Sequence, residues 1–323
     1  MAISANSLQG FLAVYAQQSL EQLIADAPVL NRFTTNFDTS IASGGVSVTT
    51  RLPNIVWGTP NDLATNGWAS TPASASSVTI TLKERNYDLP FNELEFATIT
   101  PTMLQNLYFP AMTKQLANGI VVDAINNVTS SVFTTTMTVN SSSQLSVIGA
   151  TSSLQYASQL LTQNEVPEVG RFAYVSPAAY SGLIQGVSST YIYGSPDALR
   201  EYRGLKLIDF EPVYQYPRFY NASVPAGGSY VGQAGSGTVV TNDKLIGIAG
   251  HGQGLVAAMR APIDVNNGLV QSATAVDKSS GISLQVRLVY DVSKPLWRLA
   301  VVSIFGTAAG NPKAIVPILT NSI

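Results

Sequence analysis

The first recurring feature of the chain is a stripe of hydrophobic residues at helical spacing. Over residues 7–25, apolar side chains follow the i, i+3, i+4 pattern of an amphipathic helix, and Ser7 is placed to cap its start. The stripe consists of Leu8, Phe11, Leu12, Tyr15, Leu20, Leu23 and Ile24. Such a helix fits the core of its own domain, and it equally fits an arm that packs on another subunit.

Two stretches with a period of two follow and predict a pair of strands. Hydrophobic positions alternate from Val46 to Leu52 and again from Val78 to Leu82, and the polar segment between them carries Trp57 and Trp68. Structureless loops of this length are uncommon inside compact domains, and an isolated hairpin is marginally stable in water. We interpret the segment as a two-stranded arm that projects from the body and lies on a neighbouring subunit, rather than as a loop folded back on its own domain.

Helical spacing returns after residue 99. Thr100 and Pro101 form a cap and first-turn pair, and the hydrophobic positions continue to Val128. Pro110 lies inside the stripe and is expected to kink or restart the helix. A helix of about 25 residues spans roughly 38 Å, which suits a structural strut.

A compact α/β region is expected after a Ser/Thr-rich connection over residues 129–150, and the end of the chain is β-rich. The pattern predicts a helix from Leu154 to Leu161, a strand over 171–176, a helix opening at Ser176 and Pro177, and strands over 205–209, 245–249 and 255–260. Residues 282–290 alternate, and residues 296–305 are nearly all apolar, as in a strand buried on both faces.

Composition narrows the class of protein. Only 11% of the residues are charged, against roughly 25% in an average soluble protein, and the net charge of −2 argues against a strongly basic nucleic-acid binder. The chain has no cysteine and one histidine, which excludes disulfides, thiol catalysis and metal sites with two histidines from one chain. We expect neither a membrane-spanning helix nor a signal peptide. Because desolvating charge is costly, the low charge indicates a surface buried against neighbours, although a secreted β-rich adhesin or coat would also fit.

Candidate chemistry is sparse. His251 lies in the segment GHGQG, which has neither Walker nor Rossmann spacing and is interpreted as a glycine-rich turn between two strands. Glu93 and Glu95 would share a face of a strand and could bind a cation, but a polar face paired with arginines is the commoner arrangement. We therefore assign no catalytic, cofactor-binding or metal residue and expect that the protein is not an enzyme. Basic residues are scattered, so contact with DNA should be weak and independent of sequence.

The order of these parts, and two short motifs, resemble a known family. One motif contains Asn164, Pro167, Arg171, Ser176 and Pro177, which match a helix, an N-x-x-P-x-x-x-R turn, a strand and an S-P helix start. The other is TNGWASTPASASSVTITL, a Gly-Trp hairpin tip that feeds a strand. Nearly the whole chain resembles the major capsid proteins of tailed bacteriophages, with the Hong Kong 97-like fold, and in particular the short-tailed phage coat type.

The resemblance implies an α+β fold with an N-arm, an extended β-hairpin E-loop, a long spine helix, and peripheral and axial domains. The expected boundaries are 1–44 for the N-terminal arm, 45–83 for the E-loop, 84–145 for the peripheral domain with the spine helix, 146–265 for the axial domain, and 266–323 for a β-rich return to the peripheral domain.

The function implied is that of a major capsid protein that self-assembles, as hexamers and pentamers, into an icosahedral shell around double-stranded DNA. The implied partners are other copies of the chain, a scaffolding protein, a portal, a decoration protein and weakly contacted DNA, without cofactor or membrane, in a virion assembled in the host cytoplasm. Phe11, Tyr15, Trp57 and Trp68 are the expected intersubunit contacts. An encapsulin-type nanocompartment shell and a secreted β-rich enzyme or adhesin are the alternatives.

Overall fold

The computed structural model describes residues 5–26, 34–35, 47–54, 74–92, 108–129, 131–139, 153–175, 179, 201–202, 205–208, 244–267, 269–277 and 281–320. These residues form two sheets of six strands, a separate two-stranded hairpin and three α-helices. The helices are α1 (Ala5–Asp26), α5 (Phe109–Ile125) and α6 (Leu154–Gln163). Helices and strands are both present in quantity, as the expected α+β class requires.

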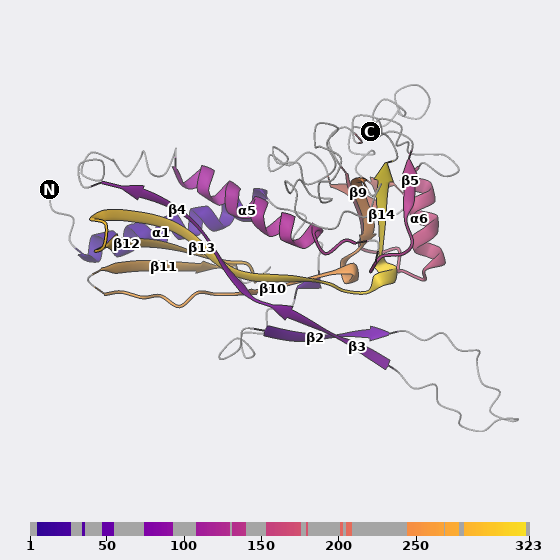
Figure 1. Cartoon of the computed structure of the whole chain (residues 1–323), viewed down its shortest axis with the longest axis horizontal. Coiled ribbons are helices and arrows are strands. Elements are labelled where there is room, and N and C mark those ends of the chain that lie inside the picture. The colour runs from indigo at the N-terminus through magenta and orange to yellow at the C-terminus, as the bar shows by residue number, and fades with distance from the viewer. Residues whose placement is uncertain are drawn as a thin grey trace, which may run out of the picture.

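One sheet, which we call the long-strand sheet, forms the elongated part of the molecule (Figure 1). Its central strand is β13 (Leu296–Ala309), which pairs with β4 (Lys83–Phe91) along one edge. Along the other edge β13 pairs with β12 (Ser283–Asp291) and then with β10 (Leu255–Arg260). The sheet is completed by β11 (Val270–Val276) beside β12 and by β1 (Thr34–Thr35) beside β10.

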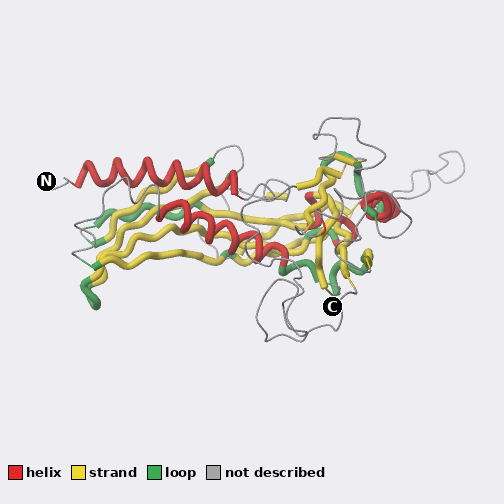
Figure 2. The backbone as a smooth tube through the Cα atoms, turned by 90° about the horizontal axis from the view of Figure 1, so that it is seen from above, coloured by secondary structure: helices red, strands yellow, loops and turns green. Residues whose placement is uncertain are grey.

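Helices α1 and α5 run along one face of the long-strand sheet (Figure 2). Alternate strand residues, including Leu284, Val286, Leu299 and Val301, pack with apolar residues of both helices in the largest core cluster. The next residues of the same strands point to the opposite face, because side chains alternate along a strand. The expected amphipathic helix, the alternating strand over 282–290 and the buried strand over 296–305 are confirmed.

The other sheet, which we call the short-strand sheet, lies at the opposite end of the molecule from the start of α1 (Figure 1). Its strand order is β5 (Met137–Val139), β14 (Ile315–Thr320), β9 (Lys244–His251), β6 (Arg171–Val175), β8 (Leu205–Ile208) and β7 (Glu201–Tyr202). Helix α6 packs on it through Leu154, Ala157 and Leu161, which share a core cluster with residues of β6, β9 and β14. This arrangement agrees with the predicted helix over 154–161 and with the predicted strands over 171–176, 205–209 and 245–249.

Two strands pass side by side from one sheet to the other, while the expected segment boundaries stay a prediction. Strand β9 continues through η7 (Gly252–Gly254) into β10, and β13 continues through η8 (Pro312–Ala314) into β14. Backbone bonds join the crossings, from Gly310 N to Gly254 O and from Asn311 N to Gln253 O, both 2.8 Å. Residues 255–260 therefore lie in the long-strand sheet, and residues 315–320 lie in the short-strand sheet. The hydrophobic pattern does not identify the partner of a strand, so it gave no sign of this exchange.

Helix α5 is the part of the expected spine helix that falls within the described residues. It begins at Phe109, with Pro110 in its first turn. Residues 93–107 lie outside the described residues, so whether Pro110 kinks or restarts a longer helix stays a prediction. Its 17 residues give a length of about 26 Å at 1.5 Å per residue. Thr100, Pro101 and the preceding Glu93 and Glu95 lie outside the described residues.

Candidate assembly surfaces

The hairpin arm consists of β2 (Ser47–Asn54) and β3 (Ser74–Thr81), which pair only with each other among the described strands. They are antiparallel, with the register running from Ser47 opposite Thr81 to Asn54 opposite Ser74. Figure 1 shows the arm leaving the body beside β10 and extending away from both sheets. The predicted pair of strands is confirmed. Where its side chains are described, one face of the arm is buried and the other is exposed.

The base of the arm is fixed to the body by a small apolar cluster. Val48, Ile80 and Leu82 pack against Val256 and Ala258 of β10. Gly306 of β13 makes this close approach feasible, because a Cβ atom there would lie 2.3 Å from the carbonyl oxygen of Thr81. The described part of the arm is therefore anchored at its base. Trp57 and Trp68 lie outside the described residues, so their expected contacts with a neighbouring subunit stay a prediction.

Helix α1 packs tightly on its own chain. The Tyr15 ring stacks on Phe109 of α5 with 4.5 Å between centroids, and Phe11 meets Tyr15 edge-on at 4.1 Å. Only 3% of Tyr15 is exposed, and burial raises its pKa to about 12. Tyr15 thus has little surface left for a neighbour. The intersubunit role expected of Phe11 and Tyr15 stays a prediction. Among the described side chains of α1, which begin at Phe11, Val14 is the exposed large apolar one.

The face of the long-strand sheet that the helices leave open carries charges paired across strands. Arg287 Nη1 lies 2.7 Å from Glu84 Oε1, joining β12 to β4. Arg298 bridges Asp88, at 2.8 Å, and Asp291, at 3.2 Å. The hydrogen bond that Arg298 donates to Asp88 is the main cause that raises the pKa of Arg298. The hydrogen bond that the Ser293 hydroxyl donates to Asp291 is the main cause that lowers the pKa of Asp291. Such exposed pairs contribute little stability each, but they leave these charges compensated within one chain.

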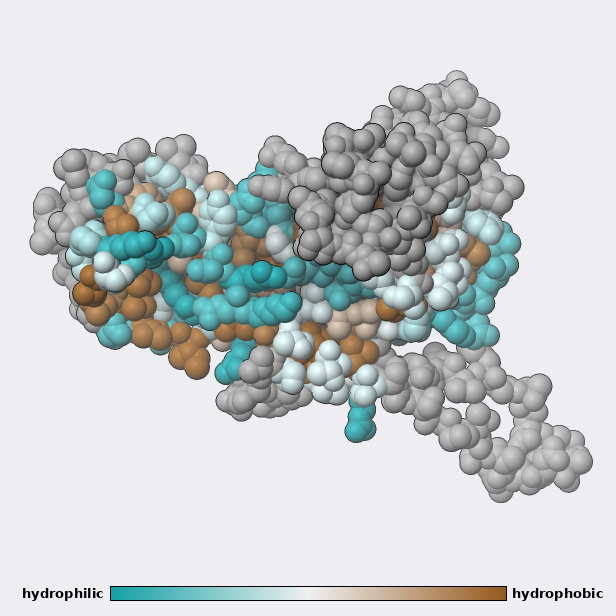
Figure 3. Space-filling view, viewed as in Figure 1, coloured by the Kyte–Doolittle hydropathy of each residue, from teal (hydrophilic) through white to brown (hydrophobic). Residues whose placement is uncertain are grey.

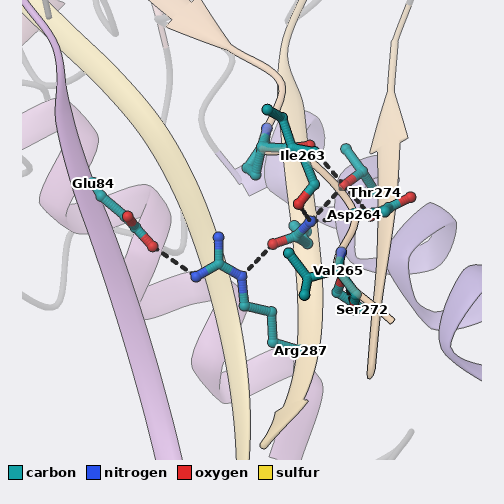
Figure 4. Close-up of polar contacts among 9 residues, drawn as sticks. Glu84, Ile263, Asp264, Val265, Ser272, Thr274 and Arg287 are labelled. Atoms are coloured by element: carbon teal, nitrogen blue, oxygen red, sulfur yellow. Dashed lines mark hydrogen bonds and ion pairs between the residues drawn. The ribbon is translucent and has the colours of Figure 1, made fainter. Parts of the chain in front are cut away.

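A polar network at one edge of this face holds the crossover segment, residues 261–267, which connects β10 to β11 (Figure 4). Thr274 donates its hydroxyl to the Pro262 carbonyl at 3.1 Å or to Asp264 Oδ1 at 2.6 Å. The side-chain amide of Gln285 donates to the Ile263 carbonyl and to Asp264 Oδ1, both at 3.0 Å. The Arg287 guanidinium also contacts Gln285 and so connects this network to Glu84. None of these bonds could be anticipated from the hydrophobic pattern, because they join polar residues far apart in sequence.

The resemblance motif has a clear structural role at the end of α6. The Arg171 side chain is 1% exposed, and its guanidinium donates to the carbonyls of Pro167 and Ser158, at 2.9 and 3.2 Å, and to that of Val166. Burial lowers its pKa from the ordinary arginine value. Asn164, at the C-cap of α6, donates its side-chain amide to the Lys313 carbonyl in η8 at 3.0 Å. The motif therefore closes a helix end and joins it to the crossing, while Ser176 and Pro177 lie outside the described residues.

His251 lies at the end of β9, in the crossing between the two sheets. Its Nδ1 accepts a bond from the Gln253 backbone N–H at 3.3 Å, and its Nε2 lies 3.1 Å from the Val169 carbonyl. Burial is the main cause that lowers the pKa of His251, which favours the neutral ring that the Nδ1 contact requires, while Nε2–H donates to the Val169 carbonyl. Gly254 is needed here because a Cβ atom would meet the Ile315 side chain at 2.3 Å. The predicted glycine-rich turn between two strands is confirmed.

The described part of the chain holds no group of three or more His, Asp or Glu side chains placed to bind a metal ion. Among the same residues, no helix is long and apolar enough to cross a membrane.

Comparison with solved structures relates this arrangement to one class of protein. The chain aligns with the "Capsid structure of the Cyanophage P-SCSP1u" at a TM-score of 0.50 and 10% identity, over 90% of this chain and 87% of that one. It also aligns with the "Capsid of native GTA particle computed with C5 symmetry" at a TM-score of 0.52 and 10% identity, over 91% and 90%. The chain has a phage-capsid fold. No protein-family model and no curated protein sequence matches it. The alignments cover about nine tenths of the chain, which agrees with the prediction that the resemblance extends over nearly the whole chain.

Proposed function

We propose that the chain is a major capsid protein that self-assembles into an icosahedral shell enclosing double-stranded DNA. The observation that carries the proposal is the structural similarity to capsid structures, which covers about nine tenths of this chain and of each capsid chain. The arm supports it, because β2 and β3 pair with no other described strand, and an isolated two-stranded hairpin is marginally stable in water unless it packs on another surface such as a neighbouring subunit. The low charge supports it as well, since neutral polar surfaces are cheaper to bury.

In this proposal the parts divide as in the Hong Kong 97-like coats. The long-strand sheet with α1 and α5 is the peripheral domain, the short-strand sheet with α6 is the axial domain, and β2 and β3 are the E-loop. Copies join as hexamers and pentamers in a virion assembled in the host cytoplasm. A scaffolding protein, a portal and a decoration protein are the further partners, and packaged DNA is contacted weakly.

Electron microscopy of the purified, expressed chain tests the proposal. Closed shells of uniform size are the expected result. A protein that stays monomeric or forms a small closed oligomer over the concentration range in which coats assemble would contradict it, and would favour the enzyme or adhesin class.

The double variant Trp57→Ser, Trp68→Ser tests the assembly role of the arm. We expect fewer shells with an unchanged unfolding temperature of the free subunit, because these tryptophans are expected to contact a neighbour. A lower unfolding temperature of the free subunit would show instead that they pack within their own chain. The matched control is Trp297→Ser, since Trp297 packs against Tyr290 of its own sheet with 5.0 Å between ring centroids and should lower that temperature.

A further inference from the structure

The two sheets are connected by two short turns that lie side by side. We call residues 251–254 and 310–314, which include η7 and η8, the sheet joint, because β9 continues through it into β10 and β13 into β14. Within the sheet joint, Asn311 N donates to Gln253 O at 2.8 Å. The turns approach closely, since a Cβ atom on Gly310 would lie 2.2 Å from the same carbonyl oxygen. The fit of the two turns therefore depends on the position of the Gln253 backbone.

The ring of His251 fixes this backbone from outside the turn. Its Nδ1 accepts a hydrogen bond from Gln253 N at 3.3 Å, and its Nε2–H donates to the Val169 carbonyl at 3.1 Å. The ring lies against Gly170, which has a φ of +88° and where a Cβ atom would lie 3.3 Å from Nε2. Both ring nitrogens are thus used, and they connect the loop between α6 and β6 to the sheet joint.

Protonation of the ring removes one of these two contacts. A neutral imidazole accepts at one nitrogen and donates at the other, whereas a protonated imidazole donates at both. A protonated Nδ1 would direct its N–H at the backbone N–H of Gln253, so this bond is lost while the bond to Val169 is kept. Gln253 then has to move away from the ring, and its carbonyl oxygen is the acceptor for Asn311 N.

The charge nearest in register to the ring opposes its protonation. Arg171 of β6 lies directly opposite His251 of β9, and its guanidinium is buried. The other charged residues of the adjoining loop and turns are exposed, and they are Glu165, Glu168 and Lys313. Neither η7 nor β14 contains a charged residue, and Figure 3 shows mostly pale side chains, of intermediate hydropathy, where Figure 1 places η8. A proton on the ring therefore adds a positive charge beside Arg171.

We propose that His251 is a pH-sensitive latch on the sheet joint: the neutral ring keeps the two turns paired, and protonation opens the bonds between them while both sheets stay folded. The sheets are also connected through the largest core cluster, in which Phe172 and Tyr174 of β6 lie together with residues of α5. Opening the joint therefore loosens one of two connections and lets the sheets shift without separating. The latch belongs to the single subunit, so it does not rest on the proposed function.

Hydrogen exchange of the free subunit, followed by mass spectrometry at about pH 7.5 and about pH 5, tests the latch. The chain has one histidine, and no other side chain has an ordinary pKa in most of this range. After correction for the intrinsic effect of pH on exchange, we expect protection of residues 308–314 to fall at least about tenfold on acidification. Residues 297–303 of the same strand pair with β12 and β4, and their protection should change by less than about twofold. The single histidine ring signal in NMR should titrate with the same midpoint.

Two variants identify the group that titrates. His251→Gln has no titratable ring, so protection of residues 308–314 should be the same at both pH values. Glu168→Gln is the matched control, because it removes an exposed carboxylate from the loop that the ring contacts and should keep the wild-type response to pH.

The latch would be overturned by protection of residues 308–314 that does not depend on pH, or by a decline that persists in the His251→Gln variant or is lost in the Glu168→Gln variant. An equal decline in residues 297–303 would overturn it too, because it would show a loss of global stability instead of a local opening. If the His251→Gln variant does not fold, the wild-type comparison decides alone: a ring that titrates with a midpoint different from that of the exchange contradicts the latch, and a shared midpoint supports it.

Discussion

Arg171→Met isolates the energetic role of the buried guanidinium at the end of α6. Methionine keeps an unbranched apolar side chain in the site but donates no hydrogen bond. The carbonyls of Val166 and Pro167 then lose the guanidinium donor, whereas the Ser158 carbonyl keeps the Thr162 hydroxyl at 3.0 Å. An orphaned buried acceptor costs about 1–3 kcal/mol, so we expect the free energy of unfolding of the subunit to fall by about 2–6 kcal/mol. That is a large share of the roughly 5–15 kcal/mol typical of folded proteins.

Urea unfolding of dissociated subunits, followed by circular dichroism, measures this loss. Arg51→Met is the matched control, because Arg51 is exposed on the arm and its replacement should change the free energy by less than about 0.5 kcal/mol. Arg171→Lys should fall between the two, since an ammonium group keeps the charge but cannot span the same carbonyls. The reasoning would be refuted by an Arg171→Met subunit that unfolds at the wild-type urea concentration, or by an equal loss in the control.

Three further expectations concern the arm junction, the crossing and the interior. Gly306→Ala should destabilise the subunit by about 1–3 kcal/mol in thermal unfolding, because the added Cβ atom would clash with the β3 backbone. Gly119→Ala is the control and should not destabilise the subunit, because no atom lies within 4 Å of the added Cβ atom; equal effects of the two variants would contradict the expectation. The pKa of His251 is lower in the folded state than in the unfolded state, so the stability that His251 contributes is present above pH 6.5 and is lost as pH falls through the folded-state pKa. His251→Gln should therefore flatten the decline in unfolding temperature between about pH 7 and 5. An unchanged slope of unfolding temperature against pH would contradict this. Dissociated subunits should bind duplex DNA weakly and in a salt-sensitive manner, because the only charged residues of α5 are Lys114 and Asp123, and Asp123 pairs with Arg85 at 3.0 Å. A dissociation constant far below the micromolar range, or a marked sequence preference, would contradict this expectation.

Elements with a strong internal period were predictable from the sequence. The stripe over residues 7–25 corresponds to α1, and the alternation around Val48 and Ile80 corresponds to the arm. Strand β4 was not predicted, since its residues are mostly polar and include Pro90. Its place at the outer edge of the sheet explains both features, because an edge strand tolerates proline and exposed charge.

The candidate surfaces were predictable only where they depend on local sequence. The hairpin follows from the length and polarity of one segment, and the helix-closing motif from the residues around Arg171. The crossover segment was not identified, because its interest lies in Asp264 meeting Gln285, 21 positions away in sequence. The register that brings them together is set by the pairing of β11 with β12, which no local pattern specifies.

The few charges of the chain and its proposed assembly have a common physical basis. Along β4, Glu84, Arg85 and Asp88 each pair with an arginine or a carboxylate on another element of the same subunit. These charges therefore bind strand to strand and strand to helix, and a contact surface does not have to desolvate them unpaired. Contacts between copies are then left to apolar side chains and backbone groups, which salt does not screen. Under the proposed function, cohesion of the shell should consequently depend on buried apolar surface far more than on ionic strength.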